Sequence, residues 1–386
     1  MITSGINFIN FKIKKKSNLV KNFFFSLLKK KNEVINSLSK EYKNSFNKKA
    51  INKYKKVSNY QIIGMGGSTL GAQAIYDFLN HKIRSKFNFV DNLQPNRKLN
   101  NKKNFTNLIV SKSGNTIETI INANILIKKK DKNIFITENK NSYLLLLAEK
   151  LKAEIIHHNN FIGGRFSVLS ETGMFPAELM GFKSSNFRRL NDLIKNKKIL
   201  NSLVTNVTAM MNYSKKNYNS IIINYDQNAI SLFEWYQQLV AESLGKKNKG
   251  ILPIISNMPK DNHSVMQYYL DGKKNNFYTF FFSKSSSTNK INNSNILMKS
   301  HSYLKGLSLN KIIKKQFDAT EKVFLNKNLP FRSFVVSKRD EATLGQLFCY
   351  FMLETILLGR ALGVDPYNQP AVELIKTETK KNFYKK

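Results

Sequence analysis

Two polar side chains four residues apart, Gln238 and Glu242, are the first candidates for chemistry in this chain. Apolar residues recur at helical spacing before them, so both side chains should share one face of a helix that ends at Gly245. The negative end of a helix dipole disfavours a carboxylate charge in the last turn, which favours Glu242 as a general base near neutral pH. The alternative is an exposed glutamate that pairs with Lys246 one turn later.

Two segments rich in glycine and hydroxyl side chains each follow a predicted strand and begin a predicted helix. They are Gly-Met-Gly-Gly-Ser at 64–68 and Ser-Lys-Ser-Gly-Asn-Thr at 111–116. Free backbone N–H groups at a helix N-terminus, together with hydroxyl donors, suit a phosphate monoester. A dinucleotide fingerprint would need glycine where Thr69 stands, and no P-loop sequence is present. A tight strand-to-helix turn remains the structural alternative for the first segment.

Three further residues carry weaker signals. Arg165, within Gly-Gly-Arg-Phe-Ser at 163–167, could stabilise a developing oxyanion, with a structural salt bridge as the equal alternative. His263 is a lone histidine, a type that is usually structural or exposed, and Lys376 is one lysine among dozens. No H-x-H or H-E-x-x-H spacing occurs, so we expect no metal site.

The chain is strongly basic, with 63 Lys and Arg against 25 Asp and Glu in 386 residues and a net charge of +38. The lysines run through the whole sequence among Asn and Ile, which indicates compositional drift rather than a patch for nucleic acid. We therefore expect no specific nucleic-acid partner, although the positive field would attract small anions. Cys349 is the single cysteine, which excludes an intramolecular disulfide. Neither a signal peptide nor a membrane span is indicated, so a cytoplasmic protein without a membrane partner is expected.

Short apolar strands alternate with helices along the chain, which predicts α/β architecture with mainly parallel sheets covered on both faces. The predicted strands are 59–63, 87–90, 107–110, 134–137, 154–157, 220–224, 251–255, 277–282 and 331–336. The predicted helices are a single amphipathic helix at 17–40, one ending near 79, 117–127, 143–151, the Glu242 helix, one bearing His263, and 343–362.

Two repeated α/β units are expected within a four-part chain. The parts are an N-terminal helical segment 1–45, α/β domains at 46–185 and 186–364, and a C-terminal tail 365–386 that carries Lys376. The segment 285–295 is expected to be a mobile loop, and the tail to be largely non-helical until Val372.

In their order along the chain, five motifs resemble those of the phosphoglucose isomerase family. They are GMGGS at 64–68, SKSGNT-x-ET at 111–119, GGRFS at 163–167, Q-x-x-x-ESLGK at 238–246 and NQPAVELIK at 368–376. The resemblance spans about residues 60–376. It implies two sugar-isomerase-type three-layer α/β/α domains, no cofactor, and a homodimer with its active site at the subunit interface.

The same resemblance implies a role for each matching residue. Glu242 would move the proton between C1 and C2 of the sugar, and Arg165 would stabilise the cis-enediolate. His263, from the neighbouring subunit, would open the sugar ring with help from Lys376. The residues implied to bind substrate are Gly67, Ser68, Ser111, Lys112 (mostly through its backbone), Ser113, Thr116, Gln238 and Gln369.

The expected activity is the reversible isomerisation of glucose 6-phosphate to fructose 6-phosphate, a reaction of glycolysis and gluconeogenesis. A general base, an acid–base pair for the ring and a cation for the enediolate are the groups this chemistry needs. One alternative is a dual isomerase that also accepts mannose 6-phosphate, which a competition of the two aldoses would separate. Others are a non-catalytic sugar-phosphate-binding regulator and a basic nucleic-acid binder, the latter recognisable by steeply salt-dependent DNA binding.

Overall fold

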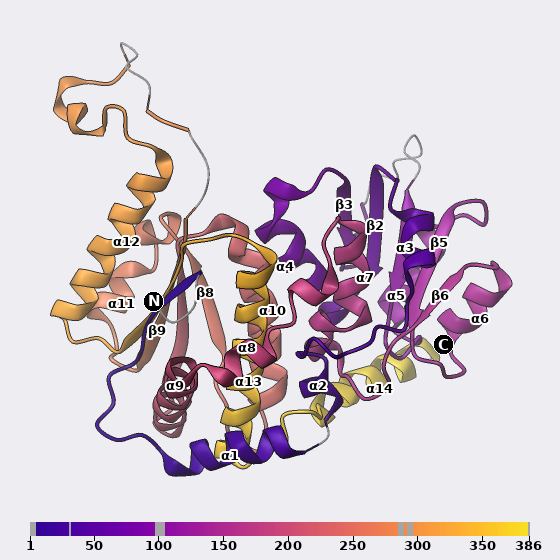
Figure 1. Ribbon diagram of the computed structural model, residues 1–386, viewed down its shortest axis with the longest axis horizontal. Helices are drawn as coiled ribbons and strands as arrows, with labels where there is room; N and C mark the ends of the chain where they lie inside the picture. The colour runs from indigo at the N-terminus through magenta and orange to yellow at the C-terminus, as the bar shows by residue number, and fades with distance from the viewer. Residues whose placement is uncertain (1–4, 31, 97–104, 285–288, 292–295, 385–386) are drawn as a thin grey trace.

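Two five-stranded sheets lie side by side, each covered by helices (Figure 1). The computed structural model describes residues 5–30, 32–96, 105–284, 289–291 and 296–384. All strand pairs in both sheets are parallel except the pairing of β1 with β10, so the predicted α/β class with mainly parallel sheets is confirmed.

The first sheet has the strand order β3-β2-β4-β5-β6. From β2 the chain crosses over to β3 on one side, and from β4 it crosses over to β5 on the other. The carboxyl ends of β2 and β4 therefore flank a crevice, which is where open α/β sheets bind ligands. The strands are β2 (Asn59–Gly64), β3 (Lys86–Val90), β4 (Thr106–Val110), β5 (Lys132–Thr137) and β6 (Glu154–His157).

Most helices of this unit connect one strand to the next along the chain. Short 3₁₀ turns, η1 (Gly66–Ser68) and η3 (Gly164–Leu169), hold two of the glycine-rich motifs. The remaining helices are α3 (Lys48–Tyr54), α4 (Leu70–Phe78), α5 (Ile117–Leu126), α6 (Tyr143–Lys150) and α7 (Glu171–Leu179), with a further 3₁₀ turn η2 (Asn80–Lys82).

The second sheet has the order β1-β10-β9-β7-β8 and repeats this arrangement. The chain leaves β7 toward β8 and β9 toward β10, in opposite directions, so a second crevice lies between the carboxyl ends of β7 and β9. The strands are β1 (Ile6–Ile9), β7 (Asn219–Asn224), β8 (Pro253–Asn257), β9 (Asn276–Ser283) and β10 (Phe331–Val336). The main helices are α9 (Lys197–Lys215), α10 (Ile230–Leu244), α11 (Met266–Asp271), α12 (Leu309–Asn326) and α13 (Glu341–Leu362).

Helix α13 is the core helix of the second unit. By length and composition it could cross a membrane, but 89% of its most apolar window is buried inside the protein. Its one interior carboxylate, Glu354, accepts a hydrogen bond of 3.0 Å from the Arg332 guanidinium and one of 3.2 Å from the Tyr236 hydroxyl. Because every member of this buried network has a partner, the charge is tolerated in an apolar core.

The structure corrects several local predictions. The single helix expected at 17–40 is two helices, α1 (Asn18–Lys29) and α2 (Glu33–Asn36), because the Asn32 side chain accepts from two backbone N–H groups and starts a new helix. The N-terminal segment also contributes the unpredicted strand β1. His263 ends a 3₁₀ turn, η6 (Lys260–His263), before α11 rather than lying on a helix. The tail becomes helical at Pro370, where α14 (Pro370–Tyr384) begins.

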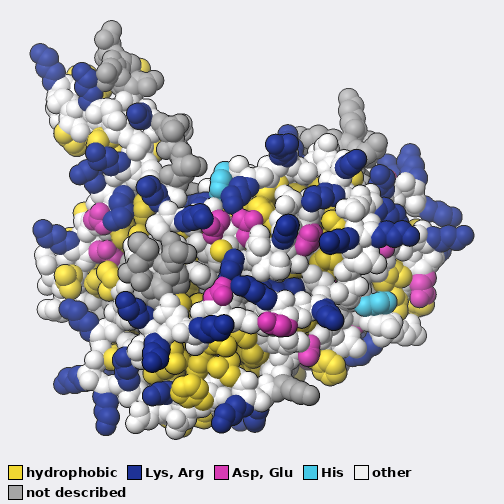
Figure 2. Space-filling view, in the orientation of Figure 1, with side chains coloured by type: hydrophobic (Ala, Val, Ile, Leu, Met, Phe, Trp, Pro, Cys, Tyr) yellow, Lys and Arg dark blue, Asp and Glu magenta, His cyan; other side chains and the backbone are white. Residues whose placement is uncertain are grey.

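The predicted loop at 285–295 lies mostly outside the described residues. Figure 2 shows Lys and Arg side chains spread over the whole visible face rather than gathered in one patch. This distribution agrees with compositional drift as the source of the net charge of +38.

Candidate active site

Arg165 is the centre of the site, because it joins parts of the chain that are far apart in sequence. It is 2% exposed and lies in η3, where its carbonyl accepts a hydrogen bond of 3.2 Å from the Trp235 indole. All three guanidinium nitrogens donate. Their acceptors are Ser243 Oγ (2.9 Å), Glu242 Oε2 (3.3 Å), Gln369 Oε1 (2.7 Å), Pro366 O (2.7 Å) and Asn368 O (3.0 Å).

The Arg165 guanidinium therefore links η3 to the end of α10 and to the segment that enters the tail. Gln369 is 204 residues from Arg165 in sequence, yet both it and Glu242 accept from the same guanidinium nitrogen. Burial lowers the pKa of the Arg165 guanidinium, and the Glu242 carboxylate opposes that change by favouring the charged form. Arginine suits this position, because its planar fork reaches several acceptors at once.

Gln238 and Glu242 share one face of α10, as their spacing predicted. The Gln238 amide donates 3.1 Å to Glu242 Oε1, while Arg165 holds the other carboxylate oxygen. Glu242 therefore contacts a guanidinium and an amide, and it forms no ion pair with Lys246 in the described part of the chain. The Lys246 ammonium instead donates to the carbonyls of Ser243 and Asp365.

The first glycine-rich motif, at 64–68, packs directly against Gln238 on α10 and Gly164 in η3. A Cβ atom on Gly66 would lie 2.8 Å from Gln238 Nε2, and one on Gly67 would lie 2.3 Å from the carbonyl carbon of Gly164. Gly66 also has a left-handed φ of +53°. Glycine is required at these two positions so that the turn after β2 can approach both α10 and η3.

The second motif lies on the neighbouring strand. Gly64 at the end of β2 pairs in register with Val110 at the end of β4, so segment 111–116 opens beside the turn that touches Gln238. Ser111 Oγ and Thr116 Oγ1 are hydrogen-bonded at 2.8 Å, and Gly114 has φ of +65°. Thr116 caps α5 without a side-chain hydrogen bond to the helix, so its hydroxyl bonds to Ser111 instead.

Lys112 and Ser113 complete this loop. The Lys112 carbonyl accepts from the Glu138 N–H at 3.1 Å, and its ammonium lies 3.3 Å from the Glu138 carboxylate. Ser113 is exposed and accepts from the Asn115 N–H at 3.3 Å. Both the ammonium and the carbonyl of Lys112 are thus engaged by Glu138, and a contribution to substrate binding through the Lys112 backbone stays a prediction.

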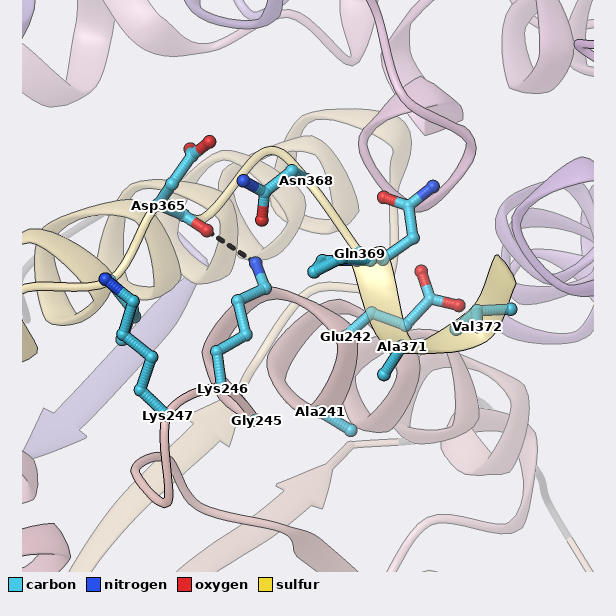
Figure 3. A pocket seen from close by; sticks show the side chains of 12 residues that line it. Ala241, Glu242, Gly245, Lys246, Lys247, Asp365, Asn368, Gln369, Ala371 and Val372 are labelled. Carbon is cyan, nitrogen blue, oxygen red and sulfur yellow. Dashed lines mark hydrogen bonds between the residues drawn. The ribbon is translucent and has the colours of Figure 1, made fainter. Parts of the chain in front are cut away.

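A pocket of about 530 Å³ opens between the end of α10 and the tail segment (Figure 3). Glu242 and Gln369 lie next to each other in its wall, and Lys246 donates to the Asp365 carbonyl on the opposite side. Burial and the Arg165 charge lower the pKa of Lys246, whereas Asp365 and Glu242 act in the other direction. The size falls within the usual range for small-molecule sites, about 300–1,000 Å³.

Of the residues expected in the site, Glu242 and Gln369 line this pocket, and Arg165 and Gln238 contact Glu242. The others do not line it: Gly67, Ser68, Ser111, Lys112, Ser113, Thr116, His263 and Lys376. His263 is exposed at the carboxyl end of the edge strand β8. Lys376 lies on α14, which buries none of its residues, and its ammonium pairs with Glu373 at 2.7 Å. Among the residues that the structure describes, no group of three or more His, Cys, Asp or Glu side chains could hold a metal ion.

Sequence reasoning missed three residues of the site: Lys246 and Asp365 line the pocket, and Ser243 accepts from the Arg165 guanidinium. Lys246 and Ser243 stand inside the Q-x-x-x-ESLGK motif, so a closer interpretation of that motif could have found them. Asp365 precedes the NQP motif and carries no signal of its own, because it reaches the pocket through its backbone carbonyl.

Comparison with known proteins gives a consistent result. Residues 27–383 match the family model described as phosphoglucose isomerase. The chain is 32% identical to a glucose-6-phosphate isomerase of Methanocaldococcus jannaschii over 350 residues, which cover 84% of each chain. It is 30% identical to that of Mycoplasmopsis pulmonis over 385 residues, covering 90% of each.

Solved structures share the fold. A hypothetical protein from Thermus thermophilus superposes with a TM-score of 0.82 at 21% identity, covering 95% of this chain and 94% of that one. A glucose-6-phosphate isomerase from Chlamydia trachomatis superposes with a TM-score of 0.68 at 18% identity, covering 99% of this chain and 82% of the other.

Proposed function

The chain belongs to the phosphoglucose isomerase family, and from that premise we propose that it interconverts glucose 6-phosphate and fructose 6-phosphate with Glu242 as the proton-transferring base. The observation that carries the proposal is the single guanidinium, Arg165, that holds both Glu242 and Gln369 at one pocket. The reaction is an aldose–ketose isomerisation of glycolysis and gluconeogenesis, and we place it in the cytoplasm.

In the open-chain sugar, Glu242 removes the proton from C2 of the aldose. Electrons of the C2–H bond form the C1–C2 double bond, and the carbonyl oxygen at C1 gains negative charge. The O2 hydroxyl proton then moves to O1, Glu242 returns its proton to C1, and the C2–O2 carbonyl forms, which completes the ketose. Arg165 lies beside the carboxylate and supplies a cation for the enediolate oxygens, in exchange for its bond to Gln369.

The phosphate of the substrate is assigned to the crevice between β2 and β4. Gly67 and Ser68 from the turn after β2, and Ser111, Lys112, Ser113 and Thr116 from the turn after β4, form this part of the site. Gln238 and Gln369 contact the sugar. Binding energy from the phosphate anchors the reacting carbons, which lie farther along the molecule toward Glu242.

Ring opening is assigned to His263 and Lys376, and the first of these acts from a second subunit. As the C1–O5 bond breaks and the C1–O1 carbonyl forms, His263 with help from Lys376 moves the O1 hydroxyl proton to the ring oxygen O5. The exposure of His263 away from the pocket of its own chain supports a homodimer in which it reaches the partner's site. Apolar side chains on α14, Leu374 (73% exposed) and Ile375 (71%), also support burial in an assembly.

Replacing Glu242 with glutamine tests the proposal. Glutamine keeps an oxygen acceptor for Arg165 but removes the base, so we expect kcat to fall by about 10²–10⁴-fold with little change in binding of fructose 6-phosphate. The measurement is a coupled assay on purified protein with fructose 6-phosphate and no added metal. Glu234→Gln, on the same helix but outside the pocket, is the control. Undiminished turnover of Glu242→Gln would refute the assignment of the base.

A further inference from the structure

A second pocket lies at the carboxyl edge of the second sheet and has no part in the chemistry proposed above. It measures about 300 Å³, at the lower end of the range for small-ligand sites. We call it the switch-point pocket, because it opens where the strand order of this sheet reverses, between the ends of β7 and β9. Its lining residues are Asn80, His81, Asn228, Lys284, Ser337, Lys338 and Arg339.

These residues come from four separate places in the chain. Asn228 follows β7, Lys284 follows β9, and Ser337 to Arg339 follow β10, so three neighbouring strands contribute at their carboxyl ends. Asn80 and His81 come from the turn after α4 in the first unit. Asn80 already donates to Asn228 at 3.3 Å, which ties the two units together at the rim of the pocket.

The lining carries three cations and no carboxylate. Arg339 pairs with the buried Asp226 behind the wall, and Lys338 lies 3.0 Å from the Asp340 carboxylate, so both are held in position. Lys284 is exposed, and the described part of the chain offers it no carboxylate partner. The remaining lining side chains are amides, a hydroxyl and an imidazole, all able to donate hydrogen bonds.

Arg339 adds a second, independent sign of a missing ligand. Its side chain is 8% exposed, and its Nε–H has no hydrogen-bond partner among the described residues. Its other two nitrogens donate to Phe78 O, at 3.3 Å, and to Asp226. A buried donor without a partner is costly, and an oxyanion at the pocket wall is a group that could satisfy it after a small movement of the side chain.

The electrostatic surroundings agree with an anion. Burial lowers the pKa of His81, and the charges of Arg339 and Lys82 lower it further, while Glu341 opposes them. Cations therefore dominate the field at the rim, although Glu341 pairs with Lys82 at 2.8 Å close by.

We propose that the switch-point pocket binds the phosphate group of a small metabolite, separately from the substrate site. The ligand would contact Lys284, Arg339 and His81 together. Helix α10 begins just after Asn228, and Glu242 lies near its far end, fourteen residues beyond Asn228. At 1.5 Å of rise per residue, about 20 Å separates the two sites. One hexose phosphate cannot reach both the switch-point pocket and the substrate site. The two sites should therefore bind their ligands independently.

Isothermal titration at constant ionic strength tests this, with inorganic phosphate and glycerol 3-phosphate as the two probes. The protein is the full chain carrying Ser111→Ala and Thr116→Val, which weaken the proposed substrate-phosphate site. We expect one remaining binding event per chain. Tighter binding of the ester would identify a metabolite as the ligand, and equal binding would identify free phosphate.

Adding Lys284→Gln and His81→Gln to the Ser111/Thr116 variant should raise the dissociation constant of the remaining binding event about tenfold. That factor is the one expected for loss of one charge-assisted hydrogen bond. Lys198→Gln, an exposed lysine on α9, is the matched control and should change it less than twofold. In an otherwise wild-type chain, the Lys284 and His81 substitutions should leave isomerase turnover unchanged. Loss of all binding in the Ser111/Thr116 variant, or binding insensitive to Lys284 and His81, would overturn the proposal.

Tungstate soaked into crystals of the wild-type protein gives an independent answer. An anomalous peak beside Arg339 and Lys284 is the expected result, whether or not a peak appears at 111–116. A peak at 111–116 alone would reject the second site while supporting the first, so the two assignments fail separately.

Discussion

At the scale of single residues, Arg165 is the group on which the geometry of the site depends. Its guanidinium serves five acceptors on two other segments, and a lysine ammonium could reach only part of that set. For Arg165→Lys we expect kcat to fall by about 10²–10³-fold, because the enediolate loses a positioned donor. Steady-state assays of the forward and reverse reactions would measure this loss.

Arg188→Lys separates this catalytic effect from the general effect of altering a buried arginine. Arg188 is also 2% exposed, and it donates to the carbonyls of Leu169 and Tyr42, away from the pocket. Both variants should lose thermal stability to a similar extent. If Arg188→Lys lowers kcat as much as Arg165→Lys, the loss reflects folding rather than a role for Arg165 in the reaction.

At the scale of elements, the approach of the turn after β2 to η3 sets where Arg165 stands. A methyl group on Gly67 would lie 2.3 Å from the carbonyl carbon of Gly164, which is backbone and cannot rotate away. We therefore expect Gly67→Ala to lower stability by about 1–3 kcal/mol and to reduce kcat by displacing η3. Thermal denaturation and the isomerase assay measure the two effects.

Gly163→Ala is the matched control for this substitution. Gly163 has φ of −67°, and a Cβ there would meet only the Phe166 ring, at 3.9 Å. The free energy of unfolding of the Gly163→Ala variant should stay close to that of the wild type. Equal losses in the two variants would mean that the motif tolerates no side chain for some reason other than the contact between turns.

How far the sequence predicts these elements depends on whether the signal is local. The strand at 107–110 is buried on both faces and contains the apolar run 108–110, and such runs can be recognised without knowledge of their neighbours. Strand β1 was missed because four residues pair with β10, more than 300 positions away. In the site, Gln238 and Glu242 follow from helical spacing, but the carbonyl of Asp365 reaches Lys246 only through tertiary packing.

The N-terminal cap of α13 gives a pH-dependent prediction at the same scale. Partial burial opposes ionisation of Asp340, but hydrogen bonds from Thr343 and Lys338 outweigh it, so its pKa lies below the ordinary value of 3.8. A lowered carboxylate pKa stabilises the fold above the unfolded-state value, and this contribution disappears as the pH falls through the folded-state value.

For Asp340→Ala we therefore expect a loss of about 1 kcal/mol in unfolding free energy at pH 7, because the Thr343 N–H loses its acceptor at 2.9 Å. The difference from the wild type should shrink below about pH 4, where the wild-type cap becomes protonated. Urea denaturation at several pH values measures it. A difference that stays constant down to pH 2 would show that ionisation of the cap makes no contribution.

At the scale of the whole molecule, the proposed reaction needs a second copy of the chain. Glu242 and Gln369 line the pocket of one chain and are joined by Arg165, while His263 is exposed beyond the edge strand β8 and does not line that pocket. A C2 dimer places the same pair of surfaces in contact twice, so two complete sites would form. Each site would then combine Glu242 of one subunit with His263 of the other.

Mixing two inactive variants tests this arrangement directly. Glu242→Gln and His263→Ala each remove a group from every site of their own homodimer. In a mixed dimer, one site has both defects and the other has neither. After unfolding and refolding together in equal amounts, half of the dimers are mixed, so we expect about one quarter of wild-type activity. If His263 acts within its own chain, every site in the mixture lacks one group, and activity should stay at the level of the separate variants.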